Sequence, residues 1–317
     1  MKINEKDIEW YANVHAQLVN NIEQQFIGKP FVVQLVLSAM IAKGHVLLED
    51  VPGTGKTHLA RVLAKSIDGQ NSRIQFTPDL LPSDITGVNI YDSAKKEFIF
   101  HQGPIFANIV LGDEINRASP KTQSAMLEVM EEGSVTTDGV TREVDKPFLV
   151  IATQNPVEQA GTYALPEAQL DRFLIKASIG YTDHSTSVSI INGSLKAKKI
   201  TNVAKLEDVV KMQKIAAEVF LDPAVSDYIV QLVEATRLAT QVRIGSSIRG
   251  AIALANISKA WAAGNGRHFV IPDDVKALAV PVLAHRLILE PEAIFDGVES
   301  EAIINQILID TPVPTGA

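Results

Sequence analysis

The sequence contains no cysteine among its 317 residues. This absence excludes a disulfide framework, a thiol nucleophile and a metal site built from thiolates. Seven histidines are present, but they form neither an H-E-x-x-H motif nor another spacing typical of metal ligands. The chemistry of this chain therefore does not rest on thiols or on a histidine metal site.

Long apolar runs are also missing. The best candidate, residues 31–42, is too short to span a bilayer and contains Gln34. Residues 1–26 carry charges throughout and lack the apolar core of a secretion signal. We therefore expect a cytoplasmic protein without a membrane span.

Basic residues are fewer than acidic residues, which gives a net charge of −8 and a pI near 5.4. Proteins whose main task is non-specific duplex binding usually carry a basic face, so nucleic acid is not an expected partner. Apolar residues make up 46% of the chain, which is enough for a sizeable core. The length fits about two domains.

Residues 44–180 alternate between strand-like and helix-like segments, which predicts a parallel α/β sheet. Asp138-Gly139 between β-prone arms predicts a hairpin within residues 134–147, and residues 88–102 indicate another β excursion. The expected strands lie at 45–49, 73–77, 108–114, 148–154 and 173–179. From residue 206 onwards the pattern is helical, so an all-α domain follows the sheet.

A phosphate-binding loop is the most specific motif. It follows an expected strand and precedes a segment with apolar residues at helical spacing, the context that confirms such a loop. Gly53 and Gly55 allow backbone N–H groups to turn inward, and Lys56 supplies a charge for the β- and γ-phosphates. Thr57 offers a hydroxyl to Mg²⁺. The residues expected to contact the nucleotide are Pro52, Gly53, Thr54, Gly55, Lys56, Thr57 and His58.

Asp50 departs from the general loop pattern G-x-x-x-x-G-K-[ST], which has glycine at that position. It lies at the exit of the preceding strand, where we expect no contact with phosphate. Restoring glycine at position 50 is therefore expected to change ATPase activity only modestly.

Two carboxylates end an apolar expected strand, Asp113 and Glu114. Open α/β sheets bind ligands at this edge. Asp113 is predicted to hold Mg²⁺ through its water shell, and Glu114 to polarise a water for attack on the γ-phosphate. Gln154 and Asn155 end another expected strand, where a neutral amide can orient that water. A plain Asn-Pro turn is the alternative explanation of Asn155.

These motifs together resemble the MoxR family of AAA+ ATPases. The resemblance rests on the phosphate-binding loop and on residues 111–133, 150–174 and 272–287, and it covers about residues 20–290. Members of this family often carry E-D-V-P-G in the loop, so Asp50 matches the family while departing from the general pattern.

The resemblance implies a fold and a division of the chain. It implies a P-loop AAA+ α/β core with a parallel sheet at residues 1–182, a linker at 183–205 and a small all-α lid domain at 206–317. Residues 82–103 correspond to the helix-2 insert of the family, and residues 134–147 to the hairpin before sensor 1. In related ring ATPases these two elements face a central pore or a partner.

The resemblance also assigns roles to three residues. Asn155 matches sensor 1, Arg172 matches an arginine finger that reaches the nucleotide of the next subunit, and Arg249 matches sensor 2. The segment around Arg249 departs from the usual G-A-S-P-R-A. Without the resemblance, a salt-bridged helix end and a solvated helix face would explain the two arginines. The expected catalytic set is Glu114, Asn155, Arg172 and Arg249, with Thr57 and Asp113 as the magnesium ligands.

The function implied by the resemblance is Mg²⁺-dependent ATP hydrolysis in a ring, expected to be a hexamer. Hydrolysis would drive chaperone-like remodelling or maturation of partner proteins with von Willebrand factor A domains, often with metal or cofactor insertion. A scaffold that binds ATP but scarcely hydrolyses it is one alternative, against which the intact catalytic set counts. A nucleic-acid motor is another, against which the acidic pI counts.

Overall fold

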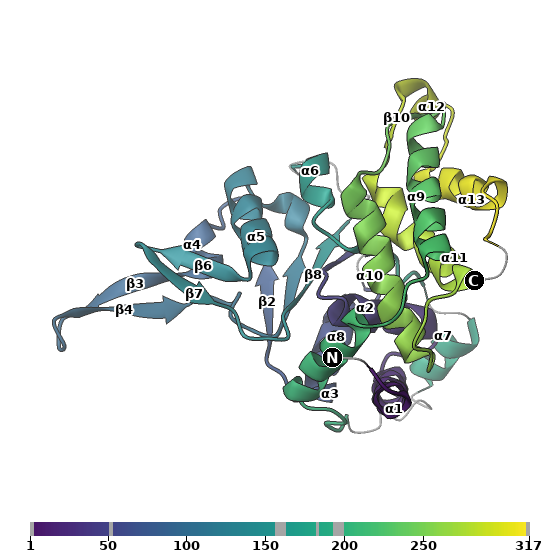
Figure 1. Ribbon diagram of the computed structural model, residues 1–317. Coiled ribbons are helices and arrows are strands. Elements are labelled where there is room, and N and C mark those ends of the chain that lie inside the picture. Colours follow the sequence, from purple (N-terminus) through teal and green to yellow (C-terminus); the bar gives the residue numbers. More distant parts are fainter. Residues whose placement is uncertain (1–2, 51–52, 156–162, 182–183, 193–199, 315–317) are drawn as a thin grey trace.

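The computed structural model describes residues 3–50, 53–155, 163–181, 184–192 and 200–314 (Figure 1). The predicted nucleotide contact Pro52 lies outside the described residues, as does part of the motif 150–174.

A five-stranded sheet forms the centre of the first domain. Its strands are β1 (Val46–Glu49), β2 (Asn71–Gln75), β5 (Ile109–Asp113), β8 (Leu149–Gln154) and β9 (Ile175–Ala177). They pair in the order β2-β5-β8-β1-β9, and every pairing is parallel. The middle strands are apolar and buried on both faces, as expected when helices cover both sides of a parallel sheet. All five predicted strands are thereby confirmed.

Helices cover the two faces of this sheet. One core cluster joins the sheet to α1 (Glu5–Glu23), α2 (Pro30–Ile41) and α3 (Lys56–Ser66). The other face packs against α5 (Pro120–Glu132) through side chains that include Met126 and Leu127. Within the described residues, no helix is long and apolar enough to cross a membrane.

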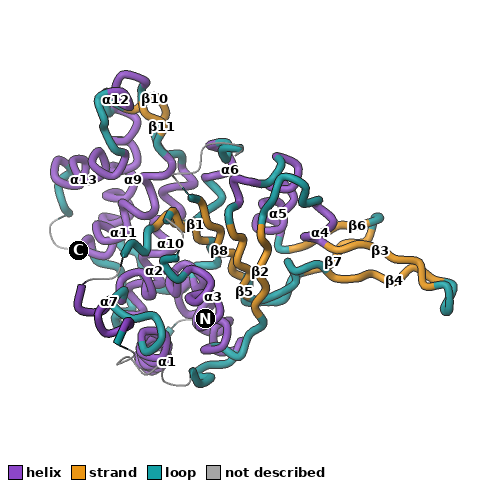
Figure 2. The backbone as a smooth tube through the Cα atoms, turned by 180° about the vertical axis from the view of Figure 1, so that it is seen from behind, coloured by secondary structure: helices purple, strands orange, loops and turns teal. Residues whose placement is uncertain are grey.

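Two β-hairpins project from the core on the side away from the helical domain (Figures 1 and 2). Positive φ angles of 53° at Asp138 and 76° at Gly139 confirm the predicted turn. The hairpins touch, because Asn89 Nδ2 donates to Asp138 Oδ2 over 2.5 Å and the Arg142 guanidinium lies 3.8 Å from the Phe100 ring centroid. We call the pair the hairpin arm; its strands are β3 (Gly87–Asp92), β4 (Glu97–Gln102), β6 (Ser134–Thr137) and β7 (Val140–Glu143).

The second domain is helical, as the sequence predicts. Its larger helices are α8 (Leu206–Ala217), α9 (Pro223–Leu238), α10 (Ile248–Gly264), α11 (Pro272–Leu283) and α13 (Ser300–Asp310). Shorter elements are β10 (Val242–Ile244), η2 (Ala284–Arg286), β11 (Ile288–Leu289) and α12 (Pro291–Phe295). A further helix, α7 (His184–Ile191), lies in the predicted linker. The exact domain boundaries at 182 and 205 remain a prediction.

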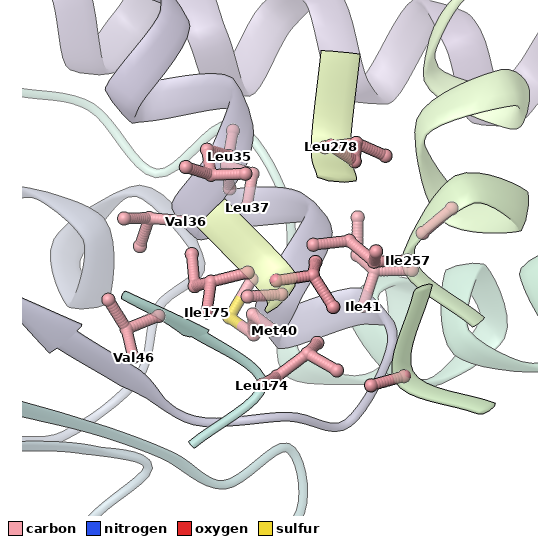
Figure 3. Packing of buried hydrophobic residues seen from close by; sticks show 14 of the residues in the cluster. Leu35, Val36, Leu37, Met40, Ile41, Val46, Leu174, Ile175, Ile257 and Leu278 are labelled. Atoms are coloured by element: carbon pink, nitrogen blue, oxygen red, sulfur yellow. The ribbon is translucent and has the colours of Figure 1, made fainter. Parts of the chain in front are cut away.

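The sheet and the lid share one hydrophobic core. Figure 3 shows Leu35 and Ile41 of α2 packed among Ile175 of β9, Ile257 of α10 and Leu278 of α11. The first two helices also pack directly on α8 and α10. Strand β9 also contacts α11 of the lid.

Candidate nucleotide-binding site

A cavity of about 480 Å³ opens at the carboxyl edge of the sheet, where β1, β5 and β8 end. It brings together most of the side chains that the sequence assigns to nucleotide, metal and water. Its lining consists of Asp50, Gly53, Gly55, Lys56, Thr57, His58, Arg73, Gln75, Asp113, Glu114, Thr153, Gln154 and Asn155.

The loop requires its glycines. Gly53 has a φ of 89° and Gly55 a φ of 92°, a region that L side chains rarely adopt. A Cβ atom at Gly55 would also lie 3.3 Å from the Phe26 ring. Gly55 is the N-cap of α3 and has no side-chain cap, and this helix end lines the cavity. The N-terminus of a helix favours an anion.

Lys56 and His58 follow at the start of α3. Lys56 Nζ donates to the backbone oxygen of Asp50 over 3.0 Å, which keeps the ammonium beside the loop. His58 Nε2 lies 3.1 Å from the Gln25 oxygen, and partial burial lowers the pKa of His58 below its ordinary value. Burial thus favours the neutral form of His58 in the chain without nucleotide.

The carboxylates Asp113 and Glu114 are oriented by a threonine that the sequence analysis missed. Thr153 Oγ1 donates to Asp113 Oδ1 over 2.7 Å and accepts the Glu114 N–H over 2.9 Å. Glu114 has a φ of 59°, a conformation that costs free energy in a non-glycine residue and is concentrated at functional sites. Two adjacent polar residues, Thr153 and Gln154, end the otherwise apolar strand β8, and this position was the available signal for Thr153.

Two side chains of β2 also reach these carboxylates. Arg73 Nη2 lies 2.6 Å from Asp113 Oδ2 and also 2.6 Å from Gln75 Oε1. Gln75 Nε2 donates to Glu114 Oε2 over 2.9 Å, and Arg117 contacts the same oxygen at 3.1 Å. The negative charge of the pair is thus balanced within the chain. Sequence reasoning missed Arg73 and Gln75, although their alternation along a strand places them on one face.

The donor set fits a magnesium–nucleotide complex. Thr57 and Asp113 both line the cavity and offer oxygen atoms, the donors that Mg²⁺ prefers. Among the residues that the structure describes, no group of three acidic or histidine side chains can hold a metal ion. A Mg²⁺ ion in this cavity would therefore depend on phosphate oxygens and water for its remaining ligands.

Arg172 and Arg249 lie together at another place. Arg172 contacts Glu131 at 3.0 Å, and Arg249 lies 4.0 Å from Glu131 and 3.8 Å from Asp171. Their side chains are 30% and 64% exposed. We call these two arginines with Glu131 and Asp171 the arginine cluster. Neither arginine is among the described residues that line the cavity.

Arg286 ties the lid to the residues before β9. Its side chain is 3% exposed and pairs with the Asp171 carboxylate. It also donates to the backbone oxygens of Asp171 and Phe173 over 2.9 and 2.8 Å. Burial lowers the pKa of Arg286 to about 10, so the guanidinium remains charged at neutral pH. The sequence analysis did not single out this residue.

Comparison with known proteins decides the family. Residues 45–175 match the model of the ATPase family associated with various cellular activities (AAA), and residues 234–307 match that of the AAA lid domain. Chaperone MoxR1 of Mycobacterium tuberculosis is 40% identical over 315 residues, which cover 96% of this chain and 84% of that protein. The chain belongs to the MoxR family of AAA ATPases. Protein MoxR of Paracoccus denitrificans is 30% identical, with 84% and 86% of the two chains covered.

Other relatives of this MoxR-family ATPase agree. Uncharacterized protein YeaC of Bacillus subtilis is 50% identical over 299 residues, 93% of each chain. A crystal structure from Cytophaga hutchinsonii, provisionally described as an ATPase, superposes with a TM-score of 0.92 at 38% identity over 98% of each chain. The predicted family, the α/β core with a helical lid and the ATPase activity are thereby confirmed.

Proposed function

We propose that this MoxR-family ATPase hydrolyses ATP in the cavity at the end of β1, β5 and β8. Lys56 and the N–H groups of the loop would bind the β- and γ-phosphates, and Thr57 and Asp113 would hold Mg²⁺. Bound with the nucleotide, Mg²⁺ would offset the charge of the phosphate oxygens. The observation that carries this proposal is the convergence of Lys56, Asp113, Glu114 and Asn155 on one cavity.

Glu114 would act as the base for the attacking water. Gln75 and Arg117 both contact its Oε2 atom, so Oε1 would accept the proton of the water. Asn155 is 8% exposed at the end of β8 and would orient the same water without adding charge. A positioned base typically contributes about 10²–10⁴-fold to the rate.

Arg172 would act on the nucleotide of a neighbouring copy, and Arg249 would link the lid to the γ-phosphate, in its own chain or in the neighbour. Both are outside the cavity of their own chain as far as it is described, and both contact Glu131. A guanidinium from the next subunit would stabilise charge spreading over the γ-phosphate oxygens. This arrangement supports a ring of subunits, for which we propose six.

The hairpin arm would contact the protein that is remodelled. It exposes apolar side chains, with exposed fractions of 49% at Ile90, 51% at Tyr91 and 71% at Phe98. Exposed apolar groups of this kind are typical of protein contacts. The relative MoxR1 of Mycobacterium tuberculosis is named as a chaperone. We propose that this ATPase is cytoplasmic and that its clients carry von Willebrand factor A domains and are matured by metal or cofactor insertion.

A mixing experiment tests the ring mechanism. Arg172→Ala should bind ATP normally but hydrolyse it about 10³–10⁵-fold more slowly. Lys56→Ala should lose ATP binding, because it removes the ammonium beside the loop. A mixture of the two variants at fixed total protein should regain activity. Some of its sites then combine an intact phosphate-binding loop with an intact Arg172 from the neighbouring copy.

The alternative outcomes are separable. If mixed oligomers form but activity never exceeds the sum of the two variants, Arg172 works in its own chain or is only structural. If both variants hydrolyse ATP at the normal rate, the assigned cavity is wrong. Measuring the rate with and without DNA distinguishes a nucleic-acid motor, which DNA would stimulate.

A further inference from the structure

Asp50 joins the start of the phosphate-binding loop to the segment that leaves β9. Ser178 Oγ and the Gly180 N–H both donate to Asp50 Oδ1 over 2.9 Å. The Ile179 N–H donates to Oδ2 over 2.6 Å. Asp50 is only 4% exposed. A carboxylate buried with three donors is a specific contact, because charge-assisted hydrogen bonds are strong and a buried unpaired group is costly.

The backbone of the same residue faces the loop. Its oxygen accepts the hydrogen bond from Lys56 Nζ at 3.0 Å, and its N–H donates to the Gln154 oxygen at 3.2 Å. Asp50 therefore contacts the loop lysine through its carbonyl and the exit of β9 through its carboxylate. A phosphate in the loop would compete with this carbonyl for the Lys56 ammonium.

A second contact holds the same two strand ends together. Glu49 and Lys176 form an ion pair at 2.5 Å. Beside this pair lies a cavity of about 290 Å³, bordered by Ser178, by Pro281 of α11 and by Glu301 of α13. The exit of β9 is thus a place where the α/β core meets the lid.

The other end of β9 is bound to the lid directly. His285 Nε2 lies 3.1 Å from the Phe173 oxygen, and Arg286 donates to that same oxygen. Within β9, Ile175 packs into the cluster that contains Leu278 of α11 (Figure 3). The residues that flank β9 on both sides, together with Ile175 within it, therefore connect the Asp50 carboxylate to the lid.

We propose that Asp50 is a positioning residue that transmits the state of the phosphate-binding loop through β9 to the lid. The inference rests on the proposed role of Lys56 in binding nucleotide. A bound phosphate draws the Lys56 ammonium away from the Asp50 carbonyl, and Asp50 then shifts. Because the Asp50 carboxylate is hydrogen-bonded to the N–H groups of Ile179 and Gly180, these two residues move with it. Glycine at position 50 would lose the three hydrogen bonds that the Asp50 carboxylate accepts. Under this proposal the change in ATPase activity should therefore be larger than the modest one predicted from the lack of a phosphate contact.

Hydrogen exchange measured with and without a non-hydrolysable ATP analogue tests this role. In the unaltered protein the analogue should change exchange in peptides covering 178–181 and 278–287. In Asp50→Ala the amides of Ile179 and Gly180 should exchange faster, and the response of the 278–287 peptide should disappear. Affinity for the analogue should fall about tenfold, within the range of coupling between sites.

Two further variants keep the result interpretable. Asp50→Asn retains the volume but has one acceptor oxygen, and its NH₂ group would oppose a backbone N–H, so we expect an intermediate response even if Asp50→Ala folds poorly. Asp68→Asn is the matched control, because Asp68 also binds a later segment through Asn202 Nδ2 at 2.7 Å but lies outside the cavity lining. It should respond like the unaltered protein.

The role of Asp50 and the assignment of the nucleotide site can be tested separately. Weak analogue binding by Lys56→Ala together with a normal lid response in Asp50→Ala and Asp50→Asn would overturn the role of Asp50 alone. Normal analogue binding by Lys56→Ala would overturn the assigned site and this inference with it.

Discussion

The nucleotide cavity and the arginine cluster both gather charged side chains, but they hold them differently. In the cavity, Asp113 receives donors from Thr153 and Arg73 at 2.7 and 2.6 Å, and its side chain is 14% exposed. In the cluster, Arg249 is 64% exposed and meets its carboxylates only at 3.8 and 4.0 Å. Exposed ion pairs contribute roughly 0–1 kcal/mol to stability, so a phosphate group of another molecule can displace the carboxylates from Arg249. The cavity is organised within one chain, whereas the role that we propose for the cluster is to meet a group from another.

Glu114→Gln tests the cavity side of this contrast and should have a larger effect on hydrolysis than Arg249→Ala. The amide keeps the size of the side chain and a hydrogen-bonding group beside Gln75 but cannot take a proton. Turnover should fall about 10²–10⁴-fold while ATP affinity is retained. Single-turnover rates and a binding titration measure the two quantities separately.

Glu128→Gln is the control for that change. Glu128 is exposed on α5, close in sequence to the arginine cluster and absent from the cavity lining. It should hydrolyse ATP at the normal rate. Unchanged turnover in Glu114→Gln would mean that another group activates the water, and the cavity would not be organised for catalysis as we propose.

Arg249→Ala should have a smaller effect than Arg172→Ala. We expect about a tenfold fall in turnover, equivalent to about 1.4 kcal/mol of transition-state stabilisation, because Arg249 is held more loosely. The two changes should not be additive, since both arginines contact Glu131. Turnover of the two single variants and of the double variant gives the coupling.

Mixing Arg249→Ala with Lys56→Ala shows whether Arg249 acts on the nucleotide of its own chain or on that of a neighbouring copy. Activity above the sum of the variants places Arg249 at the neighbouring nucleotide. A mixed oligomer without that gain would assign Arg249 to the nucleotide of its own chain, and the two arginines would then belong to different sites.

Much of the cavity could be predicted because its chemistry is local in sequence. The glycines, Lys56 and Thr57 stand in one loop, and Asp113-Glu114 end a strand whose apolar pattern shows where it stops. Parallel strands bring their carboxyl ends to one edge, so the sequence also predicts that these groups meet. The hairpin turn at Asp138-Gly139 was predictable for the same reason, since its conformation depends on two adjacent residues.

The remaining contacts join residues that are distant in sequence and carry no motif. Asp50 binds a segment about 130 positions away, and Arg286 binds Asp171 across 115 positions. Arg73 reaches Asp113 only because β2 and β5 are neighbours in this sheet order. The sequence shows that each group is present, but tertiary pairing selects its partner.

His45 is a buried polar side chain that differs from the residues of both the cavity and the arginine cluster. His45 Nδ1 accepts the Val150 N–H at 3.0 Å, so its Nε2 must carry the proton that is donated to the Met130 oxygen at 3.0 Å. A second proton would break the first bond. Burial lowers the pKa of His45 to about 4, against an ordinary value of 6.5. His45 should therefore affect folding stability and leave turnover at pH 7 unchanged.

The sign of the pH dependence follows from this lowered pKa. Below pH 6.5 the unfolded chain binds a proton at His45, whereas the folded chain does not until about pH 4. Stability should be fully present above pH 6.5 and fall toward pH 4, by up to about 3 kcal/mol for this residue. Denaturant unfolding at pH 7, 6 and 5 measures it. His15 and His285, whose pKa values burial also lowers to about 4, add similar slopes. His45→Gln should therefore unfold with a smaller pH dependence than the unaltered protein, and an equal dependence would show that His45 is not held neutral by the fold.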